Sequence, residues 1–192
     1  MDSAGRHINR QRLLGAVVYF ATNTNYCGKI KLFKLLYLLD FQHFRETGRS
    51  VTGADYSAFK FGPVPDVLMQ EWDRPEPDFD TVAKIVPEQV IDYVRQTVKP
   101  QAPFDDDEFT PRQLRIMQEL AEKYKDTRSP EIIDVVHAQN GAWDRVWNQG
   151  RGLNQRIPYE MALADDAPHR QAMLERQSED HQRMAARRAF GC

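Results

Sequence analysis

The sequence predicts a mainly helical fold of the α+β class: a compact helical domain around a central buried helix, with a small antiparallel β element. Three observations predict it. Residues 28–47 are apolar around most of a helical circumference. Helical patterns with clear starting signals resume after residue 109. Between these regions, prolines and β-branched residues interrupt the helical pattern and favour short strands.

The amino-acid composition limits the classes of protein to which the chain can belong. The chain has 192 residues, of which 41% are hydrophobic and 28% charged, as expected for a globular domain with a core. The net charge of −2 leaves no general surplus of positive charge for phosphate binding, which argues against nucleic acid as a partner. Two cysteines, Cys27 and Cys192, predict neither a disulfide framework nor a zinc site. Without a signal-peptide pattern or a membrane-length apolar run, we expect a cytoplasmic protein with no membrane partner.

The first predicted helix spans residues 6–21. Its apolar residues recur at helical spacing on one face: Leu13, Leu14, Val17, Val18 and Ala21. The polar residues 23–25 end it, because short polar side chains compete for backbone hydrogen bonds.

The second predicted helix, residues 28–47, is the most informative segment. Its apolar circumference predicts that other elements cover it on several sides. Its basic residues and one glutamine share a narrow arc: Lys31, Lys34, Gln42 and Arg45. We expect this arc to be solvated, with a stripe facing a partner as the alternative. Gly48 ends the helix, because glycine adopts the left-handed cap conformation readily.

One residue breaks the apolar pattern of the second helix. Asp40 lies between Leu36 and Phe44 on the apolar arc, with Lys29 and His43 as its nearest polar neighbours. A buried carboxylate must be paired, hydrogen-bonded or protonated. We expect Asp40 to accept from backbone N–H groups of the following loop, or to pair with a cation, and thereby to fix the loop. Replacing it should lower the unfolding free energy by about 1–3 kcal/mol.

The loop of residues 51–64 follows. Residues 56–61 alternate in a way that favours a short strand. The sequence Gly62-Pro63-Val64-Pro65 predicts a stiff, extended turn, because each proline restricts itself and the residue before it. A short helix over residues 66–72 should come next. Aromatic residues on a rigid turn suit an interface, so the candidate partner-binding residues are Phe59, Lys60, Phe61 and Val64. Some of these rings could instead belong to the core.

The remaining elements have local signals. Residues 81–86 and 91–98 favour a small hairpin, and residues 105–108 form an acidic loop. Thr110 and Gln113 predict a capping box with Pro111 at the first helical position. Further helices should start at residues 129–130 and 158–160. Residues 161–192 read as a charged, helical or frayed extension, separate from a domain that covers residues 6–160.

Signals for catalysis are weak. No histidine lies three or four residues from another histidine or a cysteine, and no nucleophile motif is present. Asp40 and His43 are one helical turn apart, which favours a structural hydrogen bond or no direct contact over a shared metal or proton. Cys27 stands at a helix start, where its pKa could fall, but an ordinary semi-buried thiol explains it better. We therefore expect no enzyme, no catalytic residues, no metal and no cofactor.

Two motifs carry a family resemblance. They are the segment of residues 31–40, KLFKLLYLLD, and the segment of residues 56–65, which holds Tyr56, Ala58 and the Gly62-Pro63-Val64-Pro65 run. Together they resemble the Panacea domain, also called SocA-like or GepA-like, of bacterial and phage antitoxins. The corresponding signature positions are Lys31, Lys34, Tyr37, Asp40, Gly62 and Pro63. The chain departs from the pattern at Phe33, where a polar residue is expected, and in the segment after Asp165, which has no counterpart in the family.

The resemblance implies a mainly helical fold and an antitoxin that binds a toxin encoded by an adjacent gene. Some members deliver the toxin to an ATP-dependent protease, so a protease adaptor is one alternative. A DNA-binding autoregulator is another, although no reading helix is recognisable and the net charge is acidic. The identity of the toxin does not follow from the fold.

Overall fold

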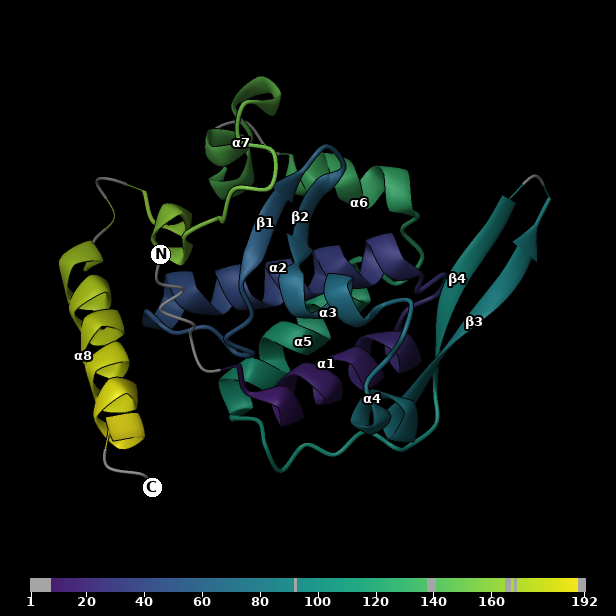
Figure 1. The fold of residues 1–192 in the computed structure, drawn as a ribbon, viewed down its shortest axis with the longest axis horizontal. Coiled ribbons are helices and arrows are strands. Elements are labelled where there is room, and N and C mark those ends of the chain that lie inside the picture. The colour runs from purple at the N-terminus through teal and green to yellow at the C-terminus, as the bar shows by residue number, and fades with distance from the viewer. Residues whose placement is uncertain (1–7, 92, 138–140, 165–166, 168, 190–192) are drawn as a thin grey trace.

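The fold of the computed structural model is described for residues 8–91, 93–137, 141–164, 167 and 169–189. A mainly helical domain with two small antiparallel hairpins surrounds one long helix, α2 (Lys29–Thr47), as Figure 1 shows. Helices α1 (Arg10–Asn23), α5 (Pro111–Lys123) and α6 (Ser129–Val136) pack against α2, together with the first hairpin. The predicted fold class is confirmed.

Helix α2 is buried on nearly every side because its side chains divide between two apolar clusters. One cluster includes Leu32, Leu35 and Leu39 and packs against α1 and α5. The other includes Tyr37 and Phe44 and lies beneath the first hairpin. A helix that is apolar around its circumference needs neighbours on several faces, and here it has them.

The helix boundaries follow local capping chemistry. The side chain of Asn9 accepts a hydrogen bond from the Arg12 backbone N–H, so α1 begins at Arg10. The predicted helix was longer at this end, and its first two residues, 6 and 7, lie outside the described part of the chain. Helix α2 ends at Gly48, which adopts the left-handed conformation with φ of 75°.

The first hairpin consists of β1 (Tyr56–Phe59) and β2 (Gly62–Pro65), so residues 62–65 form a strand where an extended turn was predicted. Prolines are tolerated here because β2 is an edge strand. On the other side of β1, the backbone of residues 154–157 hydrogen-bonds to Tyr56 and Ala58. Helix α3 (Asp66–Glu71) follows, close to the predicted residues 66–72.

The second hairpin consists of β3 (Ala83–Val90) and β4 (Tyr93–Pro100) and confirms the predicted one, although both strands begin two residues later than predicted. In Figure 1 it extends beyond the helices as an arm. A short helix, α4 (Pro77–Val82), precedes it and was not predicted. Pro77 is one of the prolines that interrupt the predicted helical pattern, and it occupies the start of the short α4, where its missing N–H has no intrahelical partner to lose.

The capping box of Thr110 and Gln113 opens α5 as predicted. After α6 come α7 (Ala142–Trp147), the 3-10 turns η1 (Asn148–Gly150) and η2 (Tyr159–Ala162), and the C-terminal helix α8 (Arg170–Ala189). Figure 1 shows α8 to one side of the domain. No helix of the described part of the chain is both long enough and apolar enough to cross a bilayer.

Candidate functional site

The side chain of Asp40 is fully buried and forms the centre of a polar cluster beneath the first hairpin. Its Oδ1 atom accepts from the backbone N–H groups of Val51, at 2.7 Å, and Thr52, at 2.8 Å. Its Oδ2 atom accepts from the hydroxyl groups of Thr52, at 2.5 Å, and Tyr56, at 2.8 Å. The prediction that Asp40 accepts from the following loop is therefore confirmed. Burial raises the pKa of the carboxyl group, and these donors oppose that rise.

Tyr159 closes the Asp40 cluster from a distant part of the chain. Its hydroxyl lies 3.2 Å from Asp40 Oδ2 and 2.6 Å from the carbonyl oxygen of Ala54. A phenol has one proton, and the shorter contact shows that Ala54 is its main acceptor. The Tyr159 ring stacks on Phe41 with their centroids 4.6 Å apart, and the Asp40 and Tyr159 side chains are both buried. Tyr159 falls within the helix start predicted at residues 158–160, and no local pattern links it to a residue 119 positions earlier.

Lys34 of α2 contacts the first hairpin from the core side. Its amine is buried and donates to the carbonyl oxygen of Pro63 at 2.8 Å. Gly62 makes this approach possible: its φ is 97°, and a Cβ there would lie 2.8 Å from Lys34 Cε and 2.9 Å from Val136 Cγ2. The signature positions Lys34, Gly62 and Pro63 therefore form one contact, in which a lysine holds the start of β2.

Lys31 is also buried. Its amine donates to the carbonyl oxygens of Asn25, at 2.7 Å, and Lys125, at 3.0 Å. The prediction that the basic arc is solvated was therefore wrong for Lys31 and Lys34, and holds for Arg45, which is exposed. A helical wheel shows the direction in which each side chain points. It does not show that loop carbonyl groups lie on the same face of the helix and accept hydrogen bonds from the buried amines.

Tyr37 is buried one turn before Asp40. Its ring contacts Phe41 at 4.1 Å and Tyr56 at 5.6 Å, and its hydroxyl hydrogen-bonds to the backbone of Trp143. Burial raises the pKa of this hydroxyl. Tyr37 thus connects the hairpin to α7, and the six signature residues all lie inside the domain.

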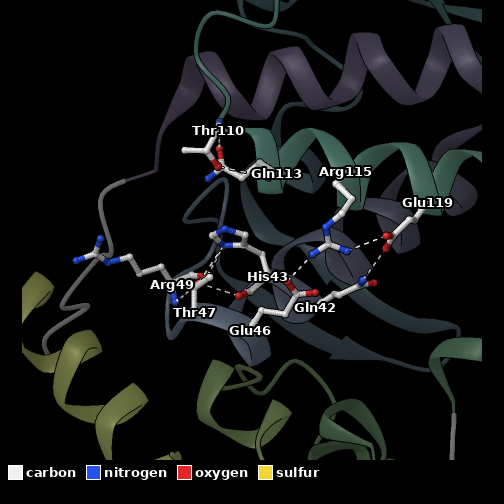
Figure 2. Close-up of polar contacts among 9 residues, drawn as sticks. All are labelled: Gln42, His43, Glu46, Thr47, Arg49, Thr110, Gln113, Arg115 and Glu119. Carbon is white, nitrogen blue, oxygen red and sulfur yellow. Dashed lines mark hydrogen bonds and ion pairs between the residues drawn. The ribbon is translucent and has the colours of Figure 1, made fainter.

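His43 makes no hydrogen bond to Asp40. Its Nδ1 atom lies 2.7 Å from the carbonyl oxygen of Arg49 and therefore carries the proton that it donates. Figure 2 shows this contact at the C-terminal end of α2, beside the Thr47 hydroxyl that donates to the His43 carbonyl oxygen at 2.8 Å. The same figure shows Arg115 of α5 bridging Glu46 and Glu119, each at 2.7 Å. These contacts tie α2 to the loop and to α5.

The turn of the first hairpin is the exposed part of the site. Lys60 is exposed, and the Phe61 side chain is 59% exposed. Phe59 is half-buried, and its carbonyl oxygen accepts from Trp143 Nε1 at 3.1 Å. Val64 is buried in the core, so of the four candidate partner-binding residues Lys60 and Phe61 are the most exposed to solvent.

Two groups of potentially reactive side chains lie outside the Asp40 cluster. Cys27 is buried, and burial raises the pKa of its thiol to about 11, so the thiolate that a nucleophile requires is disfavoured at neutral pH. Among the described residues, three neighbouring potential metal ligands occur together at Asp105, Asp106 and Asp107, which are all exposed on a loop.

The buried amine of Lys34 predicts an unusual pH dependence. Burial lowers its pKa to about 7 from the ordinary 10.5. At pH values between about 7 and 10.5, Lys34 binds more protons in the unfolded state than in the folded state, so the unfolding free energy should rise with pH. Below pH 7 the amine is protonated in both states, and the contribution of Lys34 to the unfolding free energy should be constant. We expect the unfolding free energy of the wild type minus that of Lys34→Met to increase from pH 7 to 9.5, with a limiting slope of about 1.4 kcal/mol per pH unit.

Urea denaturation of both proteins at pH 6, 7, 8, 9 and 9.5 measures this difference. Other titrating groups, including Cys27, are common to both proteins and cancel. A difference that stays constant with pH would show that the amine keeps its charge and is better hydrated than its burial indicates.

The motifs now have a physical explanation, and the comparisons agree with it. A model of the family described as antitoxin SocA-like, Panacea domain, matches residues 32–144, more than half of the chain. The matched range contains Asp40, Lys34 and the first hairpin. Searches of curated proteins and of solved structures gave no match. The chain therefore belongs to the SocA-like antitoxin family that is defined by the Panacea domain.

Proposed function

We propose that this protein is a non-catalytic antitoxin, which neutralises a toxin encoded by an adjacent gene by binding it directly through the turn of the first hairpin. The observation that carries the proposal is an exposed aromatic side chain, Phe61, on a turn that the buried signature residues hold in place. Membership of the antitoxin family supports the role, and the exposed turn supplies the surface.

The turn is prepared for binding because its backbone is fixed from two sides. Lys34 holds the carbonyl group of Pro63, and Trp143 holds that of Phe59. An aromatic side chain on a rigid backbone loses little conformational entropy when it binds, and such residues often contribute most of the affinity of an interface.

Further apolar surface lies beside this turn. Leu153, which is 52% exposed, immediately precedes the segment that pairs with β1. Val135 of α6 is exposed next to Val136, whose side chain reaches Gly62. Apolar side chains around one aromatic anchor are typical of the centre of a protein interface.

Replacing Phe61 with alanine should weaken toxin binding by about ten-fold or more, because a central aromatic anchor is worth about 2 kcal/mol. The melting temperature should change little, since Phe61 is mostly exposed. The test co-expresses the tagged chain with the neighbouring gene and measures growth, co-purification and the dissociation constant. Met69→Ala is the matched control, because Met69 is also an exposed apolar residue and belongs to α3, which follows the end of β2 opposite the turn.

The same experiment distinguishes the alternatives. Equal binding by Phe61→Ala and the wild type would contradict the role of the turn. Rescue of growth together with a shortened half-life of the toxin would identify a protease adaptor. Unchanged toxicity in the presence of the wild-type chain would overturn the antitoxin proposal for that gene pair.

A further inference from the structure

The surface around the turn of the first hairpin is formed by two segments that are distant in the sequence. Residues 154–157 pair with β1: the Asn154 N–H donates to the Ala58 carbonyl oxygen at 2.9 Å, and the pairing is antiparallel. Because antiparallel strands run in opposite directions, the loop of residues 148–153 lies at the end of β1 that carries the turn of residues 60–61. In Figure 1 this end of the hairpin lies beside α7 and α6.

These two segments differ from the rest of the chain in charge. Residues 57–65 and 148–156 contain no acidic residue, although acidic residues outnumber basic ones in the whole chain, at 28 against 26. The basic residues of the two segments are Lys60, Arg151 and Arg156. A chain with a negative net charge therefore concentrates positive charge beside Phe61, the exposed aromatic side chain of the turn.

Two of the three basic side chains have no partner in the domain. Arg156 forms an ion pair with Asp55, which directly precedes β1 at the end of the hairpin opposite the turn. Lys60 and Arg151 are exposed, and neither forms an ion pair with any residue in the described part of the chain. Their charges are therefore free to contact carboxylates of another molecule.

Two acidic residues border this surface, and neither pairs with its free cations. Asp144 of α7 is half-buried and lies close enough to His137 to interact with it electrostatically. Asp134 of α6 is exposed, but the residue of α6 that reaches Gly62 of the hairpin is Val136. Residues two positions apart in a helix point in nearly opposite directions, so Asp134 points away from the hairpin.

The free cations are held next to apolar side chains. The loop is pressed against α7 at Gly152, where an added Cβ would overlap a backbone carbonyl group of that helix. This contact fixes the neighbours of Gly152, namely Arg151 and Leu153, of which Leu153 is 52% exposed. The Lys60 amine lies 5.6 Å from the centroid of the Phe61 ring. Charged groups around exposed apolar side chains are the arrangement of a polar rim around the centre of an interface.

A second copy of the chain and a nucleic acid fit this surface less well than an acidic protein does. Two copies that met turn to turn would bring like charges together. The exposed acidic loop of residues 105–108 could meet the turn of another copy, but contacts between different surfaces form open chains of molecules unless the rotation closes a ring. A nucleic-acid surface makes about six to ten phosphate contacts, and two free cations do not provide them.

We propose that the toxin presents an acidic surface to this turn, with carboxylates that pair with Lys60 and Arg151 around an apolar pocket for Phe61 and Leu153. This inference rests on the proposed function and adds the partner's chemistry to it. Complementary charges at the rim of an interface act mainly on the association rate constant, and salt screens their effect.

The test measures the association rate constant of the full chain with the purified toxin at about 50 and 500 mM sodium chloride. Association of the wild type should be slower at the higher salt concentration by about ten-fold or more. The charge-reversed variant Lys60→Glu/Arg151→Glu should associate at least about ten-fold more slowly than the wild type at low salt. Added salt should then speed the variant up, because it screens the new repulsion. Damage to the fold would not invert the effect of salt in this way.

Lys84→Glu/Lys99→Glu is the matched control. It changes the net charge by the same amount, and it exchanges one like-charged cross-strand pair for another at exposed positions of the second hairpin. Its association rate constant should stay within about three-fold of the wild-type value, because charges outside the interface are largely screened. Thermal unfolding of each free protein checks that the fold is retained.

The outcomes separate this inference from the proposed function. If Phe61→Ala weakens the complex but the charge-reversed variant associates like the wild type, the acidic surface is contradicted and the proposed function stands. The same holds if charge reversal leaves toxin binding unchanged and abolishes only self-association of the chain or binding of its promoter DNA. If the wild type neither rescues growth nor binds the toxin, both proposals fail.

Discussion

Replacing Asp40 with alanine should lower the unfolding free energy by about 4 kcal/mol. The substitution leaves four buried donors without their acceptor: the N–H groups of Val51 and Thr52, and the hydroxyl groups of Thr52 and Tyr56. The Asp40, Tyr56 and Tyr159 side chains are all buried, so bulk water does not hydrate these donors in the folded protein. This loss of about 4 kcal/mol exceeds the loss of about 1–3 kcal/mol expected from the sequence, because the sequence does not show how many donors contact the Asp40 carboxylate.

Asp40→Asn should be less damaging, at about 2 kcal/mol, because one oxygen can still accept from both N–H groups. Asp106→Ala, at an exposed position of the acidic loop, is the control and should change the unfolding free energy by less than about 0.5 kcal/mol. Equilibrium unfolding in urea measures all three. An Asp40→Ala protein as stable as the wild type would show that the cluster does not support the fold.

Replacing Gly62 with alanine should cost about 3 kcal/mol of unfolding free energy. Part of this is the positive φ of 97°, and the rest is the overlap of the new Cβ with Lys34 and Val136. Relief of the overlap would move the lysine amine away from the Pro63 carbonyl group. Chemical denaturation gives the loss of stability, and binding of the toxin should weaken as well because the turn loses its support.

Gly150 offers a matched control for this experiment. Its φ of 94° is nearly the same, but the nearest contact of an added Cβ is Trp147 at 3.7 Å, an ordinary distance. Gly150→Ala should therefore show only the backbone contribution, about 1 kcal/mol. Equal effects of the two substitutions would contradict the close approach of Lys34 to Gly62.

Much of the fold could be predicted from local patterns. The capping box at Thr110 and Gln113 fixes the start of α5 by chemistry that is complete within four residues. The apolar circumference of α2 shows that it is central, and β-branched residues indicate the second hairpin. Helix α4 was missed because Pro77 is compatible with both a break and a helix start, and only the tertiary structure decides between them.

Less of the candidate site than of the fold could be predicted from the sequence. Asp40 could be identified because a carboxylate on an apolar face must find donors. Lys31 and Lys34 were assigned to solvent, since lysine is rarely buried and their acceptors are backbone carbonyl groups of distant loops. Backbone acceptors occur at every residue, so no side-chain pattern marks them. For the same reason Tyr159 could not be linked to Asp40 before the fold was known.

The signature residues and the proposed binding surface have separate roles. Asp40, Lys34 and Gly62 lie inside the domain and hold the backbone of the first hairpin and of the loop before it. Phe61 is largely exposed to solvent, where a substitution should cost the fold little. One scaffold could therefore serve different toxins when the exposed residues change and the buried residues stay the same.

The most direct test of the account mixes the purified chain with the purified product of the adjacent toxin gene, without ATP or protease. Size-exclusion chromatography with light scattering detects the complex, and calorimetry gives its dissociation constant. Neutralisation by contact predicts a stable complex with a dissociation constant below about 1 µM, weakened by Phe61→Ala. Rescue of growth in cells without any complex between the purified proteins would contradict direct binding as the mechanism.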